Sequence, residues 1–427
     1  MALGDAHSLL LKQDGSVWAA GRNEHGQLGD SSRVTRTDFV RVFARGAQAV
    51  AAGSDHSLVL RQDGSVLAAG QNNVGQLGDG SKQDSLVFVQ VANGINVVAL
   101  AAGSRHSLIV ATDGSLWATG SNEEGQFGDE TKNNTDVFVQ IVSSGVLTVA
   151  AHSQHSFMLK RDGTLWSTGL NGYGQLGGQK EDRRRTFQKV VQTREGVKAV
   201  STNRFATLVL MYDGSVWGVG GRQAGNVPFF SNGDFTKVFS HSAQSVSVGL
   251  THSLIVTQSG SVFAVGSNQF GEFGDGSGES SKSVFRKVVS SGVPAVAAGN
   301  YVSFVVRQDG NVLATGKNPH GQLGLGPSLN SLTAFTQIAR LVVPNYGTWC
   351  MQLEVITRDT VIILVHSTIS SWKILSLFFS TSAPVLSFRL HAILCISSSR
   401  PLHYRFISCI HHPAHSSIIR VMAIAQT

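Results

Sequence analysis

A unit of about 50 residues recurs seven times before residue 340, and this repetition indicates a repeat architecture rather than several unrelated domains. The copies align on a turn in which the second residue is always glycine, and the steps between turns are 49, 50, 49, 51, 46 and 50 residues. Glycine also stands seven and twelve positions after the first turn residue in every copy. The first turn residues are Asp14, Asp63, Asp113, Asp162, Asp213, Ser259 and Asp309.

Each unit reads as four short β-strands, which in the third copy we expect over residues 95–102, 106–111, 115–119 and 137–141. Only 14% of the residues are charged and 47 of 427 are glycine, a composition that favours strands and tight turns over helices. Between the second and third strands, Asp113-Gly114 predicts a hairpin turn in which both central residues have φ > 0. The fourth strand alternates apolar and polar residues, so one of its faces packs against a neighbouring unit.

Four-stranded units repeated around an axis predict an all-β fold, a seven-bladed β-propeller. The chain starts inside a unit, because only six residues, MALGDA, precede the second strand of the first copy. A segment from the far end is expected to supply the missing inner strand, and residues 340–346, RLVVPNY, are the nearest candidate. Their spacing differs from the repeat, with nine residues from Ile338 to Gly347 against eleven from Val42 to Gly53. The tryptophan column (Trp18, Trp117, Trp166, Trp217) is predicted to be core.

The pattern stops near residue 340, which divides the chain into a propeller over 1–340 and a non-repeat, irregular tail over 341–427. The tail holds one glycine, all three cysteines and six of the fifteen histidines. A retained intron or a frameshifted end is favoured, with a genuine accessory segment or a disordered one as the alternatives. Its cysteines and histidines (Cys395, His403, Cys409, His411, His412, His415) match no strong zinc spacing, so no metal is expected.

The net charge of +7 is divided between +3 over residues 1–340 and +4 over the tail. The repeat body is therefore close to neutral, and a nucleic-acid partner is not expected. The repeats contain no cysteine, and the first ten residues lack a basic and then apolar leader. We expect a monomeric propeller in the cytoplasm, the nucleus or both, without a membrane span.

The units resemble the repeats of the regulator of chromosome condensation family, which carry G-x-x-H-[ST]-x-x-L, D-G-x-[VL]-[WY] and G-x-N-x-x-G-Q-L-G. The matching stretches include GSDHSLVL at 53–60, DGSLW at 113–117 and NEHGQLGD at 23–30. The resemblance covers residues 1–340 and implies a seven-bladed propeller. It does not fix one function, because the family includes an exchange factor for the small GTPase Ran, ubiquitin-ligase domains, a ciliary scaffold and a plant photoreceptor.

Five His-Ser pairs begin the second strands and could suggest nucleophilic catalysis: His7-Ser8, His56-Ser57, His106-Ser107, His155-Ser156 and His252-Ser253. Adjacent strand residues point to opposite faces, so the histidine cannot activate its own neighbour. We expect half-buried imidazoles bonded to backbone. The G-Q-L-G corners are interpreted as structural, with Gln27 satisfying local backbone groups and Leu28 filling the space between blades. No catalytic residue and no cofactor are expected.

A functional surface is predicted where the repeat varies, in the loops between the first and second strands, which would form a crown on one face of the ring. The predicted partner-binding residues are Asp5, Asp55, Arg105, Gln154, Arg204, Phe205, Thr251 and Tyr301. A basic patch in a loop of the fourth unit, Arg183, Arg184 and Arg185, is the second choice. Acidic, arginine and aromatic residues together are typical of protein-binding hot spots.

The favoured function is a non-enzymatic platform that binds a protein through one face. The alternative is guanine nucleotide exchange on a Ran-type GTPase, for which the resemblance implies an acidic residue in a G-D-x-H loop. Gly4-Asp5-Ala6-His7 matches that motif. The even repeat steps leave no room for the exchange factor's inserted hairpin, and this disfavours the alternative.

Overall fold

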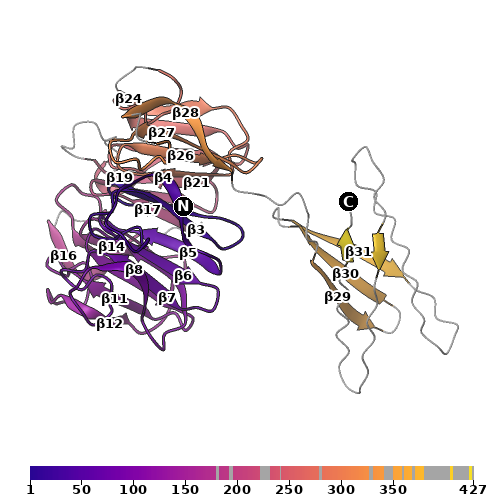
Figure 1. Cartoon of the computed structure of the whole chain (residues 1–427), viewed down its shortest axis with the longest axis horizontal. Helices are drawn as coiled ribbons and strands as arrows, with labels where there is room; N and C mark the ends of the chain where they lie inside the picture. The colour runs from indigo at the N-terminus through magenta and orange to yellow at the C-terminus, as the bar shows by residue number, and fades with distance from the viewer. Residues whose placement is uncertain are drawn as a thin grey trace. The chain divides into compact units, whose positions relative to one another are not determined.

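A computed structural model describes residues 1–178, 182–191, 196–221, 231–240, 242–277, 281–326 and 330–340, together with five strands beyond residue 349 (Figure 1). The chain divides into two compact units, Met1–Val342 and Val343–Thr427. All the regular elements of the described residues are β-strands. The described residues therefore include no helix long and apolar enough to span a membrane.

The first unit is a seven-bladed β-propeller, as the repeats predicted. Each blade is a four-stranded antiparallel sheet, and the first strands of successive blades contact one another in a closed ring around the axis. The first three blades are β1–β4 (Ala2–Leu3, His7–Leu11, Val17–Gly21, Arg36–Phe43), β5–β8 (Ala47–Ala52, His56–Arg61, Val66–Gly70, Ser85–Val91) and β9–β12 (Val97–Ala102, His106–Ala111, Leu116–Gly120, Thr135–Val142).

The other four blades have the same order of strands. They are β13–β16 (Val146–His152, His155–Lys160, Leu165–Leu170, Arg183–Val191), β17–β20 (Val197–Thr202, Ala206–Met211, Val216–Gly220, Ser231–Phe239), β21–β24 (Ala243–Val248, His252–Thr257, Val262–Ser267, Ser281–Val289) and β25–β28 (Ala295–Ala298, Val302–Val306, Asn311–Lys317, Ser331–Arg340).

The second unit contains a three-stranded antiparallel sheet and a separate strand pair. The sheet comprises β29 (Cys350–Thr357), β30 (Thr360–Ser367) and β31 (Ser371–Phe378), and the pair comprises β32 (Tyr404–Phe406) and β33 (Ala423–Ala425). None of these strands contains glycine, so none of them carries the columns of the repeat.

The Asp-Gly hairpins differ from the predicted two-residue turn. The amide of Gly15 donates to the carbonyl of Lys12 at 3.0 Å, which places Gln13 and Asp14 at the centre of the turn. Only the glycine has a positive φ, of 74°. Asp14 instead accepts two hydrogen bonds from Ser16, at 2.9 Å from the amide and 2.6 Å from the hydroxyl. The aspartate therefore fixes the turn through its carboxylate, and the prediction that its φ is positive was wrong.

The tryptophan column is half-buried rather than enclosed. Trp18 packs against the apolar cluster between the last and first blades, and its Nε1 donates to Ser16 Oγ at 3.1 Å. The Nζ of Lys12 lies 4.0 Å from the centre of the Trp18 ring. The aromatic column is thus core on one side and is covered on the other by a cation, an arrangement that repeats at Trp166 and Trp217.

The G-Q-L-G corners lock neighbouring blades together, as predicted. Leu28 is fully buried against Val59 and Leu67 of the next blade, and Gln27 Oε1 accepts the amide of His25 at 3.0 Å. Gly29, with φ of 70°, leaves the space that the ring of Phe88 fills. Phenylalanine in the fourth strand and glycine in the preceding corner are therefore one packing unit.

Ring closure was predicted wrongly. The inner strand of the first blade is β1, only two residues long, which pairs with β2 through Ala2↔Leu9 and Leu3↔Ser8. Arg340 belongs to β28 of the last blade, and residues 341–346 lie outside the described residues. Short as it is, β1 closes the ring because it contacts the first strands of the second and last blades, β5 and β25.

Candidate interaction surface

The loops between the first and second strands and the corners between the third and fourth strands lie on one face of the propeller. The amide of Arg22 in a corner donates to the carbonyl of Ala6 in such a loop at 2.8 Å, and Gln71 donates to Asp55 O in the same way. The Asp-Gly turns and the connections between blades form the opposite face, where Ala47 N bonds to Gly15 O at 3.0 Å. We call the first face the crown face and the loops before the His column the crown.

Backbone hydrogen bonds join successive crown loops around the mouth of the axial channel. Ser54 N donates to Ser104 O at 3.3 Å, and Ser104 N donates to Ser153 O at 2.9 Å. Between the last and first blades the link is made by side chains, with Asn300 Nδ2 donating to Asp5 Oδ1 at 3.0 Å. The crown is therefore a connected rim that holds its variable side chains at fixed positions.

The His-Ser pairs join blades and do not form nucleophile-base pairs. His7 Nε2 lies 2.9 Å from Ser57 Oγ of the next blade, whereas Ser8 Oγ donates to Gln322 O of the last blade at 2.8 Å. The two side chains therefore point into opposite neighbours, as the strand alternation predicted. The imidazole is fully buried and bonds to a hydroxyl, so the expectation of a half-buried ring bonded to backbone was wrong.

Burial controls the protonation of this histidine column. It lowers the pKa of His7, His106 and His252 to about 3 and that of His56 to about 4. The imidazoles are consequently neutral near pH 7 and donate one proton each to the neighbouring blade. Because each ring is buried and bonded to the next blade, it is out of reach of a substrate on the surface.

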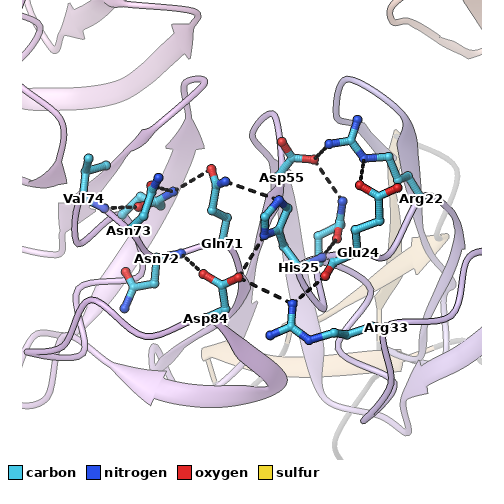
Figure 2. Close-up of polar contacts among 12 residues, drawn as sticks. Arg22, Glu24, His25, Arg33, Asp55, Gln71, Asn72, Asn73, Val74 and Asp84 are labelled. Atoms are coloured by element: carbon cyan, nitrogen blue, oxygen red, sulfur yellow. Dashed lines mark hydrogen bonds and ion pairs between the residues drawn. The ribbon is translucent and has the colours of Figure 1, made fainter.

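Asp55 is held in a polar network on the first two blades (Figure 2). Its Oδ1 lies 3.2 Å from Arg22 Nη2 and accepts Gln27 Nε2 at 3.0 Å, while partial burial raises the pKa of its carboxyl. Beside it, His25 Nδ1 lies 2.9 Å from Asp84 Oδ2 (Figure 2). Asp55 is therefore a fixed, partly buried acid of the crown.

Two aromatic clusters stand on other parts of the crown. Phe205 meets Tyr173 edge to face, with ring centres 4.7 Å apart, and Arg204 covers the ring of Phe205. Tyr301 meets Phe270 at 5.3 Å in the same geometry. In both clusters the first ring comes from the crown and the second from the corner of the preceding blade. This pairing was not predicted, although in both cases an aromatic residue stands directly before the corner's G-Q or G-E.

The remaining predicted crown residues differ in accessibility. Arg105 and Gln154 are half-buried and line a pocket of about 220 Å³ together with the exposed Arg204. Thr251 is only 8% exposed, so it is not available to a partner, and its inclusion was wrong.

The predicted basic patch is broken up by the fold. Arg183, Arg184 and Arg185 begin the outer strand β16 rather than lying in a loop. Arg184 is 2% exposed, and its guanidinium donates to Ser167 Oγ at 3.0 Å and to Gly177 O. Arg183 pairs with Glu124 at 3.3 Å. Only Arg183 and Arg185 remain at the surface, so a three-arginine patch does not exist.

Within the described ranges, no group of three or more His, Cys, Asp or Glu side chains is arranged to hold a metal ion. The histidines and cysteines of the tail that were weighed as zinc ligands lie outside those ranges.

Comparisons with known proteins agree with this architecture. The family model described as RCC1-like domain matches residues 1–236, more than half of the 427-residue chain. The model of the regulator of chromosome condensation (RCC1) repeat matches residues 243–272 and 295–322. No curated protein matches in the sequence search.

Solved structures share the fold. Human WBSCR16 is 19% identical, with a TM-score of 0.67 over 76% of this chain and 93% of that chain. Prp20p from Saccharomyces cerevisiae, in a structure described with its binding to Gsp1p and histones, is 23% identical, with a TM-score of 0.61 over 70% of this chain and 80% of that chain. At these identities the likeness is one of fold.

Proposed function

Because this chain belongs to the RCC1-like domain family, we propose that it is a non-enzymatic platform that binds another protein through the crown face of its propeller. The observation that carries the proposal is a contrast between positions in the same blade. The glycines and the His column repeat because the joints between blades require them, whereas the crown positions just beside them change charge and size.

Because the crown side chains differ from blade to blade, the nearly symmetric ring offers a partner distinguishable positions. Acidic Asp5 and Asp55 belong to the first two blades, Arg105 and Arg204 to the third and fifth, and Tyr301 to the last. An asymmetric partner can bind in one orientation only where the rim offers such differences. Arginine and aromatic side chains on a rigid scaffold are also the residue types that dominate binding energy in protein interfaces.

The test compares two sets of variants in the full-length chain used as bait. The crown set is Arg105→Ala, Phe205→Ala and Tyr301→Ala, and the control set on the opposite face is Arg45→Ala, Tyr212→Ala and Arg307→Ala. We expect the crown set to weaken capture of a partner by about tenfold or more, or about 1.4 kcal/mol, and the control set to leave it unchanged. Equal capture by wild type and the crown set would place binding elsewhere.

A second candidate is nucleotide exchange on a Ran-type GTPase. Asp5, in the G-D-x-H loop, is exposed on the crown face, and the solved structure of the similar Prp20p is described with its binding to Gsp1p. We expect Asp5→Ala to slow release of a fluorescent guanine nucleotide from the GTPase if exchange occurs. No acceleration by the wild-type chain would reject exchange and leave the platform as the proposal.

A further inference from the structure

The pocket of about 220 Å³ on the crown face is lined by hydrogen-bond donors from three successive blades. Arg105, Ser104, Ser121 and Gln126 come from the third blade, Ser153 and Gln154 from the fourth, and Arg204 from the fifth. The lining contains two guanidinium groups, three hydroxyls and two amides but no carboxylate.

Neither guanidinium forms an ion pair within the part of the chain that the structure describes. Arg105 Nη2 donates to Asn73 Oδ1 at 3.1 Å, a neutral partner, and Arg204 lies over the ring of Phe205. Two acids stand between the lining residues Ser121 and Gln126 in the sequence, and both have other partners. Glu124 pairs with Arg183, and Glu123 accepts a bond from Asn134 at 3.4 Å. The pocket is therefore a fixed positive site without its own counter-ion.

The positive charge of Arg204 also affects the pKa of the neighbouring His152. His152 lines the adjoining cavity at that mouth, where burial is the main cause that lowers its pKa and Arg204 lowers it further. Asp5 raises the pKa of His152 and has a larger effect than Arg204, and the Asp5 carboxylate accepts a hydrogen bond from Asn300. The acid at the mouth thus has a partner of its own and does not line the pocket.

The donors and the size of the pocket specify a class of ligand. Planar guanidinium groups and hydroxyl donors in one lining match the paired oxygens of a carboxylate. The volume is below the roughly 300–1,000 Å³ of sites for drug-sized molecules, so it suits one side chain rather than a cofactor.

We propose that this pocket binds an aspartate or glutamate side chain from an acidic segment of a protein partner. The inference rests on the proposed function, because it names the chemistry of the partner's contact on the crown. Arg105 and Arg204 supply the charge, and the serines and glutamines of the lining fix the orientation of the carboxylate.

The experiment measures fluorescence anisotropy of a labelled peptide, Gly-Glu-Glu-Asp-Glu-Gly, with the full-length chain. Arg105→Gln with Arg204→Gln should weaken binding at least about tenfold. The control, Arg45→Gln with Arg307→Gln, removes the same charge from exposed positions on the opposite face and should change binding less than about twofold. A Gln/Asn version of the peptide should not bind.

Three results would overturn the inference: no binding of the acidic peptide to wild type, equal losses in both double variants, or binding only of a phosphoserine version. This measurement needs no partner, so it is independent of the capture test. If the peptide binds through the arginines while the crown variants leave capture intact, the proposed function fails and the carboxylate site stands.

Discussion

The Nε2 of His56 in the second blade lies 3.0 Å from the Oγ of Ser107 in the third blade, and that hydroxyl donates to Gln76 O at 2.7 Å. Because the only proton of the serine goes to the carbonyl, the imidazole must be the donor to the serine. The same three-part link joins His7 to Ser57 and His252 to Ser303. Each link is a buried hydrogen bond between uncharged side chains of neighbouring blades.

His56→Ala should therefore destabilise the propeller by about 2–3 kcal/mol, since Ser107 loses a donor and a cavity opens beside Gly53. Urea unfolding followed by circular dichroism measures the change. His320→Ala, at an exposed corner, is the control and should change stability by less than about 0.5 kcal/mol. If His56→Ala also lowered stability by less than about 0.5 kcal/mol, the hydrogen bond between His56 and Ser107 would not stabilise the fold.

Stability should fall in mild acid. The pKa of His7, His106 and His252 is about 3 and that of His56 about 4 in the folded chain, below the 6.5 of an exposed histidine. Between these values the unfolded chain binds more protons, so each group removes about 1.4 kcal/mol per pH unit as the pH drops below 6.5. The raised pKa of Asp55 and Glu272 acts in the opposite direction but involves fewer groups. Urea midpoints that stay constant from pH 7.5 to 5 would contradict this account.

Gly120→Ala should cost about 2–4 kcal/mol in urea unfolding. Its φ is 98°, and an added Cβ would collide with the carbonyl oxygen of Arg105 and lie 2.9 Å from the Cα of His106. Gly145→Ala is the matched control, with φ of 84° and no atom within 4 Å of the new Cβ. It should show only the strain of the backbone, about 1 kcal/mol. Equal losses at the two positions would mean that close approach is unimportant.

Glu272→Gln should stabilise the protein by roughly 1 kcal/mol at pH 7.5. Glu272 occupies the corner position that holds glutamine in Gln27, Gln76 and other blades, and burial raises the pKa of its carboxyl. A carboxyl whose folded pKa is raised is least costly when protonated, so the gain should shrink as the pH falls towards 4.5. A gain that does not depend on pH would point to packing instead of charge.

A chain ending after Tyr346 should keep the unfolding curve of the full-length protein within about 1 kcal/mol. Every glycine column and every blade strand precedes this point. Circular dichroism melts and gel filtration compare the two chains. An insoluble or loosely folded truncated chain, beside a well-folded full-length one, would make residues 347–427 part of the propeller's stability.

The parts of the fold that repeat could be read from the sequence, because seven aligned copies separate the required residues from the variable ones. Gly29 and Phe88 stand in fixed columns, and the structure shows them as one contact. The strand that closes the ring could not be predicted by comparing copies, because the contact between the last and first blades occurs only once in the propeller. A two-residue inner strand such as Ala2–Leu3 carries no periodic signal.

At the crown face, the sequence predicted which loops vary but not which side chains the fold conceals. In the sequence, Arg184 cannot be told apart from its exposed neighbours Arg183 and Arg185. In the structure, the register of β16 turns the Arg184 side chain inward to Ser167. Thr251 is likewise buried, at 8% exposure, although it stands in a variable position of the crown. Pairings such as Tyr173 with Phe205 join residues of different repeats, so they appear only when one unit's corner is compared with the next unit's crown.

The single seam between the last and first blades has a consequence for biosynthesis. Most joints link residues about 50 positions apart, as His7 links to Ser57, but Asn300 with Asp5 and Gln322 with Ser8 span 295 and 314 positions. On the ribosome, the first six blades can stack in order as they emerge, while one flank of the first blade stays uncovered until the seventh is made. During that interval the flank is open to capture by a chaperone or by the seventh blade of a neighbouring chain on the same polysome.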